Sequence, residues 1–235
     1  MEVILKQFTD LYICSDAIRQ CHGTQDKTDT PKATPDGQWT TGDKDRSLIH
    51  RVGNKHKHGS TLEHLYYTFD ISGISRALLQ ELARHRIASL TVKSSRYTLK
   101  ELLHEEQFYD RNKSWNGPWT DDDFDFNRAE KYLVMTSDNL VNRASVMALD
   151  NLRTIIKKRI PNDDAKFCMP ESYKTSLTWS LNARALQNFI NLRTHDSALW
   201  EIRNLSNMVF ETLPEEHKYL FEQFNHIENL ENAES

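Results

Sequence analysis

Cysteine is scarce in this chain of 235 residues, which contains only Cys14, Cys21 and Cys168. Their odd number and the lack of Cys-x-x-Cys spacing argue against a disulfide scaffold and against a thiolate zinc site. Long apolar runs are also missing, so no stretch has the length of a membrane span. Residues 1–6 are too short and too acidic for a signal peptide. We therefore expect a cytoplasmic protein, or one in the host cytoplasm if the source is viral, without a membrane partner.

Acidic side chains are absent from residues 82–100, although the net charge of the whole chain is -4 at pH 7. A local cationic segment on an acidic chain indicates one defined anion site rather than a general polyanion surface. Arginine guanidinium groups suit phosphate oxygens, and the hydroxyls of Ser94 and Ser95 add neutral donors. On these residues alone, a solvated basic loop is an equally good interpretation. The cations are Arg84, Arg86, Lys93, Arg96 and Lys100.

The order of the expected elements favours the α+β class, with a central antiparallel sheet flanked by helices, because helices do not alternate regularly with strands. The segment after Arg86 is expected to be extended, so that Val92, Ser94 and Arg96 share a face. A helix capped by Ser75 should carry residues 84–86 at its C-terminal end, and Gly73 should end the preceding strand. Strands are expected at residues 2–8, 65–71 and 173–181, and helices at 10–21, 45–57, 163–169, 182–193, 197–213 and 215–225, with one long helix or two in tandem at 126–160.

One domain is expected over residues 1–226, followed by a polar tail at 227–235. A polar insertion at about 22–45 has no hydrophobic periodicity and is interpreted as an exposed, mobile loop.

Four histidines, His50, His56, His58 and His64, lie close together in the sequence. Zinc-binding helices place their ligands on one face, as in His-Glu-x-x-His, whereas His56-x-His58 beside a glycine does not. We therefore expect no metal site and interpret these histidines as solvated or packed side chains.

Residues 182–193 are predicted to form an amphipathic helix. Arg184 and Asn188 share one face, and Phe189 and Leu192 are expected to face the core. Arg193 follows Arg184 by nine residues, about 180° around an ideal helix. The two arginines are therefore expected to contact different groups, although a surface helix with its polar residues in water remains an alternative.

Arg84-His85-Arg86, seven further residues and then Ser94 resemble the signature of the flavin-dependent thymidylate synthases. Residues 58–64 and 182–193 resemble two further segments of that family, so the resemblance covers most of the chain to about residue 221. It implies an enzyme that transfers a methylene from methylenetetrahydrofolate to dUMP and reduces it with FADH2, which NADPH regenerates, giving dTMP and tetrahydrofolate. It also implies a homotetramer with active sites at subunit interfaces.

The resemblance further implies which residues bind each ligand. Arg193 would be catalytic, because a cation at the ionised N3 edge of the pyrimidine stabilises developing negative charge. Contacts to FAD are implied for Cys21, His58, Ser60, Glu63, Arg84, His85, Arg86, Val92, Asn182, Ala183, Arg184, Asn188 and Leu192. Contacts to dUMP are implied for Glu81, Leu82, Ala83, Arg84, Val92, Lys93, Ser94, Ser95, Arg96, Lys166 and Arg193.

Five positions depart from the family pattern and leave the fine hydrogen bonding of the pocket open. Glu81 stands where Gln is common, Cys21 where Ser is common, Val92 where Glu is frequent, Ser197 where His is frequent, and Lys166 where Arg is common.

Other functions must be weighed against this one. Methylation of dUMP through a cysteine needs a thiol in an electropositive, partly exposed setting, but the three cysteines are interpreted as packed small residues. A cofactor is thus expected to supply the chemistry. A flavin reductase without methyl transfer is one alternative. A single-strand nucleic-acid-binding module is another, with Tyr97, Trp179 and Trp200 as stacking residues. The net charge of -4 and the lack of a long basic stripe argue against nucleic acid as a partner.

Overall fold

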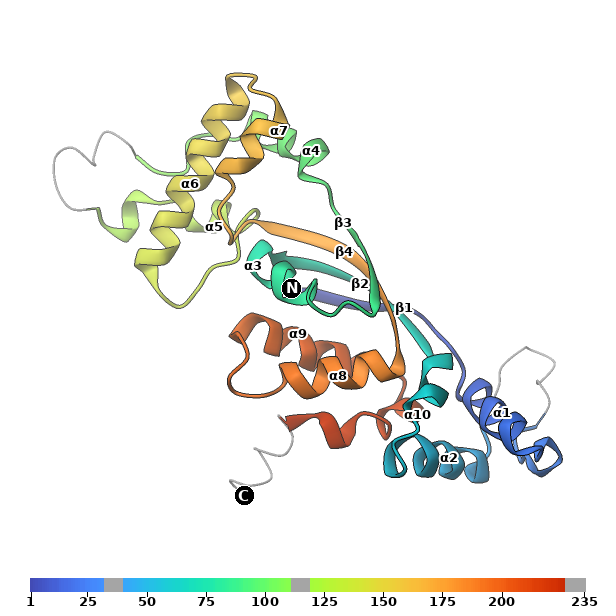
Figure 1. Ribbon diagram of the computed structural model, residues 1–235. Helices are drawn as coiled ribbons and strands as arrows, with labels where there is room; N and C mark the ends of the chain where they lie inside the picture. Colours follow the sequence, from blue (N-terminus) through green and yellow to red (C-terminus); the bar gives the residue numbers. More distant parts are fainter. Residues whose placement is uncertain (32–39, 111–118, 227–235) are drawn as a thin grey trace. The chain divides into compact units, whose positions relative to one another are not determined.

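The computed structural model describes residues 1–31, 40–110 and 119–226. Within them lies a four-stranded antiparallel sheet with the strand order β1-β2-β4-β3 (Figure 1). This sheet and its helices confirm the predicted α+β class. The strands are β1 (Glu2–Phe8), β2 (Tyr66–Ser75), β3 (Ala88–Val92) and β4 (Lys174–Asn182).

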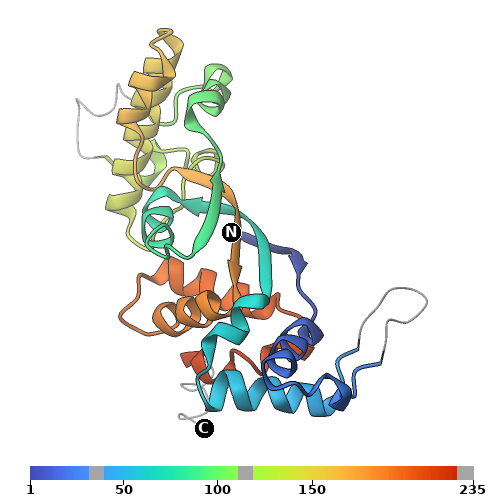
Figure 2. The same ribbon diagram turned by 45° about the vertical axis from the view of Figure 1, so that its right-hand side comes forward.

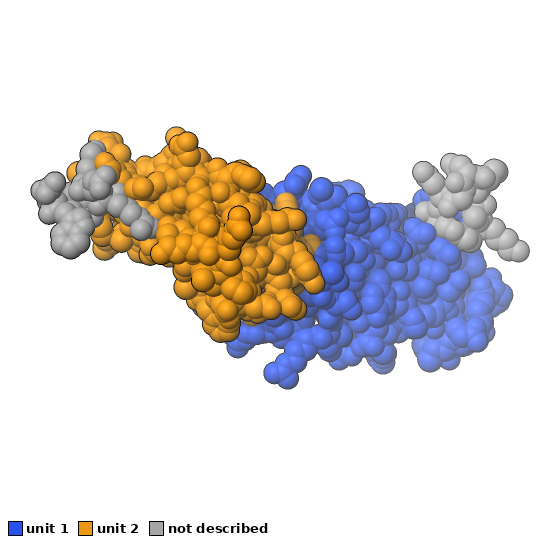
Figure 3. Space-filling view, turned by 90° about the horizontal axis from the view of Figure 1, so that it is seen from above, with its two compact units in different colours: residues 1–71, 81–91, 178–235 blue, residues 72–80, 92–177 orange. Residues whose placement is uncertain are grey.

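Two compact units divide the chain, and each is assembled from separate stretches of sequence (Figure 3). Unit 1 comprises residues 1–71, 81–91 and 178–235, and unit 2 comprises residues 72–80 and 92–177. Three of the strands continue from one unit into the other along the chain. Neither unit is a continuous segment, so the interpretation of residues 1–226 as one domain is kept as a proposal. The expected tail at 227–235 lies outside the described residues.

Unit 1 packs helices α8 and α9 beside the strands, where they lie next to each other in both ribbon views (Figures 1 and 2). Trp179 of β4 is fully buried, and its ring lies 4.9 Å from that of Phe189 on α8 and 6.0 Å from that of Phe69 on β2. Burying such a ring stabilises the fold by about 2–3 kcal/mol. This aromatic contact fixes α8, which carries much of the candidate site. The helical elements of unit 1 are α1 (Leu11–His22), η1 (Gln25–Lys27), α2 (Asp43–Ile49), η2 (His50–Lys55), η3 (Gly59–His64), α8 (Ala183–Arg193), α9 (Trp200–Glu211), α10 (Glu215–Lys218) and η8 (Glu222–Phe224).

A buried carboxylate stands at one described end of the expected insertion. Asp45 is fully buried and pairs with the buried Arg19 of α1, whose Nε donates to Asp45 Oδ1 at 2.7 Å. The hydroxyls of Thr28 and Thr30 both donate to Asp45 Oδ2 at 2.6 Å. Residues 22–31 are mostly exposed, as expected, but the hydroxyls of Thr28 and Thr30 supply partners that the buried Asp45 carboxylate requires. Residues 32–39 lie outside the described part.

Unit 2 is built around helix α6, which buries Val146, Leu149, Leu152 and Ile156 in one core cluster. This spacing of three and four residues is that of one helix face. The other helical elements of unit 2 are α4 (Ser95–Thr98), η4 (Leu99–His104), η6 (Asp121–Asp123), α5 (Phe126–Ala129), α6 (Asn139–Lys157), α7 (Asn162–Ala165) and η7 (Lys166–Cys168), and α3 (Arg76–Leu82) runs from unit 2 into unit 1.

Several predicted boundaries need correction. Gly73 does not end β2, which continues to Ser75 with Gly73 at a positive φ of 71°. Of the two alternatives for residues 126–160, one long helix or two in tandem, the structure has the second, with the single turn α5 separated by a break from α6. The helix expected at 215–225 is only α10 followed by the turn η8. Ser75 caps α3 as expected, because its Oγ accepts a hydrogen bond from the Leu78 N–H at 2.9 Å.

In the described ranges, none of the helices is both long enough and apolar enough to span a membrane.

Candidate active site

The Arg84-His85-Arg86 motif follows the end of α3, as predicted. Leu82, the last residue of α3, is fully buried and anchors the turn, and its carbonyl accepts a hydrogen bond from the His85 N–H at 3.1 Å. Strand β3 begins at Ala88. The motif is thus held between a buried helix end and a strand, with Arg84 and Arg86 exposed.

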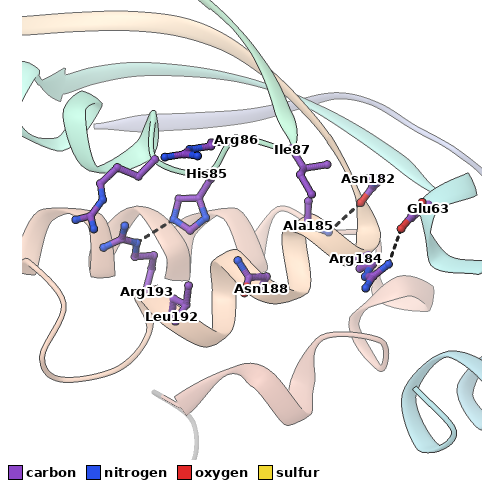
Figure 4. A pocket seen from close by; sticks show the side chains of 11 residues that line it. Glu63, His85, Arg86, Ile87, Asn182, Arg184, Ala185, Asn188, Leu192 and Arg193 are labelled. Carbon is purple, nitrogen blue, oxygen red and sulfur yellow. Dashed lines mark hydrogen bonds and ion pairs between the residues drawn. The ribbon is translucent and has the colours of Figure 1, made fainter. Parts of the chain in front are cut away.

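A cavity of about 820 Å³ lies along α8 in unit 1 (Figure 4). We call it the α8 cavity. Four arginines line it, so it suits an anionic ligand, and its volume is that of a typical small-molecule site. Its lining residues are Glu63, Arg84, His85, Arg86, Ile87, Asn182, Arg184, Ala185, Asn188, Leu192 and Arg193.

Helix α8 turns one side toward this cavity. The Asn182 side chain caps the helix by accepting a hydrogen bond from the Ala185 N–H at 2.9 Å. Phe189 is fully buried, as expected, but Leu192 is 51% exposed and lines the cavity. The prediction that Leu192 faces the core is therefore wrong, because it stands on the same side as Asn188, four residues earlier.

At one end of the cavity, the guanidinium of Arg193 is held by its own chain. Its Nη1 donates to Glu81 Oε2 at 3.0 Å, and its Nη2 donates to the Glu81 carbonyl at 3.3 Å. Its Nε donates to His85 Nε2 at 3.0 Å (Figure 4). Arg84 Nη1 lies 3.5 Å from the same Glu81 carboxylate. All three nitrogens of Arg193 therefore have fixed directions.

His85 is neutral in this arrangement. Burial, together with the adjacent charges of Arg193 and Arg84, lowers the pKa of His85 to about 4, against the opposing effect of Glu81. Because Nε2 accepts from Arg193, the ring proton lies on Nδ1. The ring also packs edge-on against Phe189, with 5.1 Å between centroids. His85 thus orients Arg193 without adding charge.

At the other end, Arg184 Nη1 donates to Glu63 Oε1 at 2.7 Å. Gly59 makes room for this side chain, because a Cβ there would lie 2.9 Å from Arg184 Nε. Arg184 and Arg193 have different partners, consistent with their expected separation around the helix. They nevertheless line the same cavity, because α8 lies along it and presents one arginine at each end.

The remaining predicted phosphate-binding residues belong to unit 2. Arg96 stands in the helical turn α4, so the expected shared face of Val92, Ser94 and Arg96 in an extended segment is wrong. Arg96 pairs with Asp163, with 2.7 Å between Nε and Oδ1, and Lys93 pairs with Glu101 at 3.5 Å. Lys166 lies 5.9 Å from the Phe167 ring centroid. That these residues bind dUMP together with Arg84 stays a prediction.

Other predicted contacts are not among the residues that line the α8 cavity. His58 and Ser60 are exposed beside Gly59, whereas Ala183 is buried. Leu82 is also buried, which leaves only its backbone for a ligand. The remaining residues of this group are Cys21, Glu81, Ala83, Val92, Lys93, Ser94, Ser95, Arg96 and Lys166, and their assignments stay predictions.

The cysteines differ from one another. Cys14 is buried, and burial raises the pKa of its thiol to about 12, so it is a poor nucleophile. Cys21 and Cys168 are exposed, which corrects their interpretation as packed residues. Neither lines the α8 cavity. Among the described residues, no three His, Cys, Asp or Glu side chains gather in a way that could hold a metal ion.

Two cavity residues, Ile87 and Ala185, were missed by the sequence analysis. Ile87 follows the Arg84-His85-Arg86 motif directly and is 73% exposed, which is unusual for isoleucine. Ala185 stands three residues before Asn188 on α8. An exposed apolar residue beside a motif, and the helical period, were the available signals.

Fold and cavity together define an α+β protein with an arginine-lined site at the end of α3 and along α8. The sequence profile of the family described as "Thymidylate synthase complementing protein" matches residues 4–217. Flavin-dependent thymidylate synthase of Wolinella succinogenes is 57% identical over 221 residues, which is 94% of this chain and 97% of the relative. That of Campylobacter jejuni is 52% identical over 226 residues, 96% of this chain and 98% of the relative.

A crystal structure of thymidylate synthase X from Helicobacter pylori with FAD and dUMP superposes with a TM-score of 0.82 at 49% sequence identity. It covers 95% of this chain and 98% of the other. The chain therefore belongs to the thymidylate synthase complementing proteins, the family of the flavin-dependent thymidylate synthases.

Proposed function

We propose that this chain transfers a methylene from methylenetetrahydrofolate to dUMP and reduces it with FADH2, which NADPH regenerates, giving dTMP and tetrahydrofolate. The observation that carries the proposal is Arg193, whose guanidinium is fixed at one end of the α8 cavity by Glu81 and His85. A fixed cation stabilises an anion that forms during a reaction without first having to be reoriented. The likeness to flavin-dependent thymidylate synthases supports the same reaction.

The residues of the α8 cavity fit FAD. A dinucleotide carries a diphosphate, which needs cations, and a flat ring system, which needs apolar surface and hydrogen-bonding groups at its edges. The cavity offers Arg84, Arg86 and Arg184 as cations for the diphosphate. Ile87 and Leu192 offer apolar surface for the ring system, and the amides of Asn182 and Asn188 can form hydrogen bonds with its edges. When bound, the flavin would supply the reducing equivalents of the reaction.

Arg193 would stabilise the ionised N3 edge of the pyrimidine. In this structure the Glu81 carboxylate accepts the hydrogen bond from Arg193 Nη1 that the pyrimidine edge would need. A bound pyrimidine anion would thus compete with Glu81 for Nη1, while His85 would keep hold of Nε. The neutral state of His85 leaves the positive charge of Arg193 undivided at this place.

The dUMP phosphate would be held by Arg84 with Ser94 and Arg96. For this, Arg96 would have to exchange its exposed partner Asp163 for the phosphate. Exposed ion pairs contribute only about 0–1 kcal/mol, so the exchange costs little. We further propose a cytoplasmic homotetramer whose active sites are completed at subunit interfaces.

Visible absorption tests the proposal directly. The purified protein should be yellow, and addition of dUMP should change its flavin spectrum. With NADPH, methylenetetrahydrofolate and dUMP added to the yellow protein, dTMP should form, and omission of any one of the three should stop sustained turnover.

The same measurements separate the alternatives. NADPH oxidation without dTMP would indicate a flavin reductase. A colourless protein that binds oligonucleotides with a steep salt dependence would indicate a nucleic-acid-binding module. Either result would overturn the proposed reaction.

A further inference from the structure

A second hollow of about 820 Å³ lies in unit 1 on helix α2 and the segments that follow it. We call it the α2 cleft. It shares no lining residue with the α8 cavity, and the proposed reaction does not use it. Its lining residues are Arg46, Ser47, His50, Arg51, Lys55, His56, Glu215, Tyr219 and Glu222.

One wall of the α2 cleft is a π-helical segment, η2 (His50–Lys55). Helical turns of this kind are rare and occur frequently at functional sites. Its back is fixed against the protein, since a Cβ on Gly53 would lie 2.8 Å from Leu62 Cδ2 and Asn54 accepts a hydrogen bond from Gln187 Nε2 at 3.0 Å. The residues on the opposite side of η2, which line the cleft, are therefore held by a segment that is packed firmly on the protein.

Two cations on this segment are unpaired. Arg51 and Lys55 are exposed, and across residues 1–31, 40–110 and 119–226 their side chains have no ion-pair or hydrogen-bond partner. Arg46, at the end of α2, makes only a long contact of 3.4 Å to the Glu216 carbonyl. Positions 51 and 55 are four residues apart, which brings their charges to one side of a helix. Together these three groups form a positive surface suited to a phosphate.

The opposite wall supplies a ring and a carboxylate. Tyr219 lies beside His50, with 6.0 Å between ring centroids, and offers an aromatic surface. Glu215 pairs with Lys218 at 3.1 Å. The exposed Glu222 has no such partner among the described residues, so its oxygens are available to accept hydrogen bonds from hydroxyl groups.

We propose that the α2 cleft binds a nucleoside phosphate. The phosphate would bind to Arg51 and Lys55, the base would lie against the rings of Tyr219 and His50, and the sugar hydroxyls would donate to Glu222. This site is separate from the α8 cavity, and the proposal holds whether or not the proposed reaction is correct.

Calorimetric titration tests this binding. The probes are AMP, adenosine 2′,5′-bisphosphate and dTTP, with inorganic phosphate as the comparison, added to protein already saturated with FAD and dUMP. At least one nucleotide should bind about tenfold more tightly than phosphate. The double variant Arg51→Gln/Lys55→Gln should lose about tenfold or more in that affinity, because it removes both charged donors to the phosphate.

Matched variants make the test decisive. Lys44→Gln removes an exposed charge from α2, the helix that precedes η2, but not from the cleft, and should bind like the unmodified protein. Glu222→Gln should weaken nucleotide binding and leave phosphate binding unchanged. A preference for the adenine probes or for dTTP identifies the class of base. The proposal is overturned if no probe binds, if phosphate binds as tightly as the nucleotides, or if the double variant binds normally.

Repeating the titration without FAD and dUMP keeps this result apart from the fate of the proposed reaction, because neither ligand touches Arg51 or Lys55 in the proposal.

Discussion

The two hollows of unit 1 both gather positive charge, but they hold it in opposite ways. In the α8 cavity, Arg193 is bound by Glu81 and His85, and Arg184 is bound by Glu63. In the α2 cleft, Arg51 and Lys55 extend without a partner in the described parts of the chain. A paired guanidinium has a fixed direction, whereas an unpaired one only adds charge.

This difference matters for chemistry. A reacting group must meet its stabilising charge within a fraction of an ångström, so a catalytic site benefits from side chains that are held in advance. A site that only binds tolerates movement, because a flexible cation can follow its ligand. The paired arginines thus favour the α8 cavity as the place of reaction, and the unpaired cations favour the α2 cleft as a place of binding alone.

Removal of Arg193 is expected to have the largest effect. Arg193→Ala should lower the rate of dTMP formation by about 10²–10³-fold, the usual loss when one preorganised donor to a developing anion is removed. Flavin binding should survive, since the other lining arginines remain. Single-turnover assays of dTMP and the flavin absorbance measure the two effects.

The control for this variant is Arg203→Ala. Arg203 is a half-buried arginine of α9 that lies 3.5 Å from Asp196 and does not line the cavity. The variant Arg203→Ala should form dTMP at the normal rate. Near-normal turnover of Arg193→Ala would remove the basis for its catalytic role and for the contrast between the two hollows.

The buried pair of Arg19 and Asp45 should have the next largest effect, on stability. Asp45→Asn leaves Arg19 buried without its carboxylate and should lower the free energy of unfolding by about 3–5 kcal/mol. Urea denaturation of the variant and the parent measures this. Because Asp45 belongs to α2, this variant tests whether the buried pair of Arg19 and Asp45 holds in place the helix that lines the α2 cleft. Lys44→Gln, on the exposed side of α2, should cost less than about 0.5 kcal/mol.

The pH dependence of this difference has a definite sign. Burial opposes ionisation of Asp45, but the hydrogen bonds from Thr28, Thr30 and Arg19 prevail and lower its pKa below the ordinary value of 3.8. The stabilisation by Asp45 is therefore fully present above about pH 4 and is lost as the pH falls through the lower, folded-state pKa. A difference between parent and Asp45→Asn that stayed constant down to pH 2 would contradict this account.

These residues also show how far a sequence can predict a site. The cationic segment at Arg84, the Asn182 cap and the polar face of α8 follow from local rules of spacing and charge, and the structure has them. The partners do not follow from local rules. Arg193 meets Glu81 across 112 positions of sequence, and Arg19 meets Asp45 across an insertion that has no periodicity. Leu192 was misplaced because an apolar residue near a cavity carries the same pattern as one in the core.

Gly59 offers a smaller change that sharpens the comparison. A methyl group in Gly59→Ala would lie 2.9 Å from Arg184 Nε and would push that side chain away from Glu63. We expect about fivefold weaker FAD binding, since misdirected hydrogen bonds to an anion cost about 1 kcal/mol. Flavin fluorescence during titration with FAD measures the dissociation constant.

Glu63→Gln separates direction from charge in this experiment. It removes an exposed ion pair but leaves Arg184 free of steric displacement, so it should change FAD affinity less than Gly59→Ala does. Equal effects would mean that the pairing, rather than the position of Arg184, controls the affinity.

The smallest expected effect is the titration of His85. Nuclear magnetic resonance of the ring protons should give a pKa of about 4, because burial and the charges of Arg193 and Arg84 disfavour the protonated ring. The pKa should rise toward 6.5 in Arg193→Ala, fall further in Glu81→Gln, and stay unchanged in Arg203→Ala. Opposite pKa shifts in the variants of the two partners of one histidine are difficult to obtain from a general change in structure.

The lowered pKa of His85 also makes stability depend on pH. Between pH 6.5 and about 4, His85 binds a proton in the unfolded chain but not in the folded one, so the free energy of unfolding should decrease as pH falls through this window. A His85 pKa near 6.5 in the parent protein would show that Arg193 is not held in this way, and the α8 cavity would then resemble the α2 cleft.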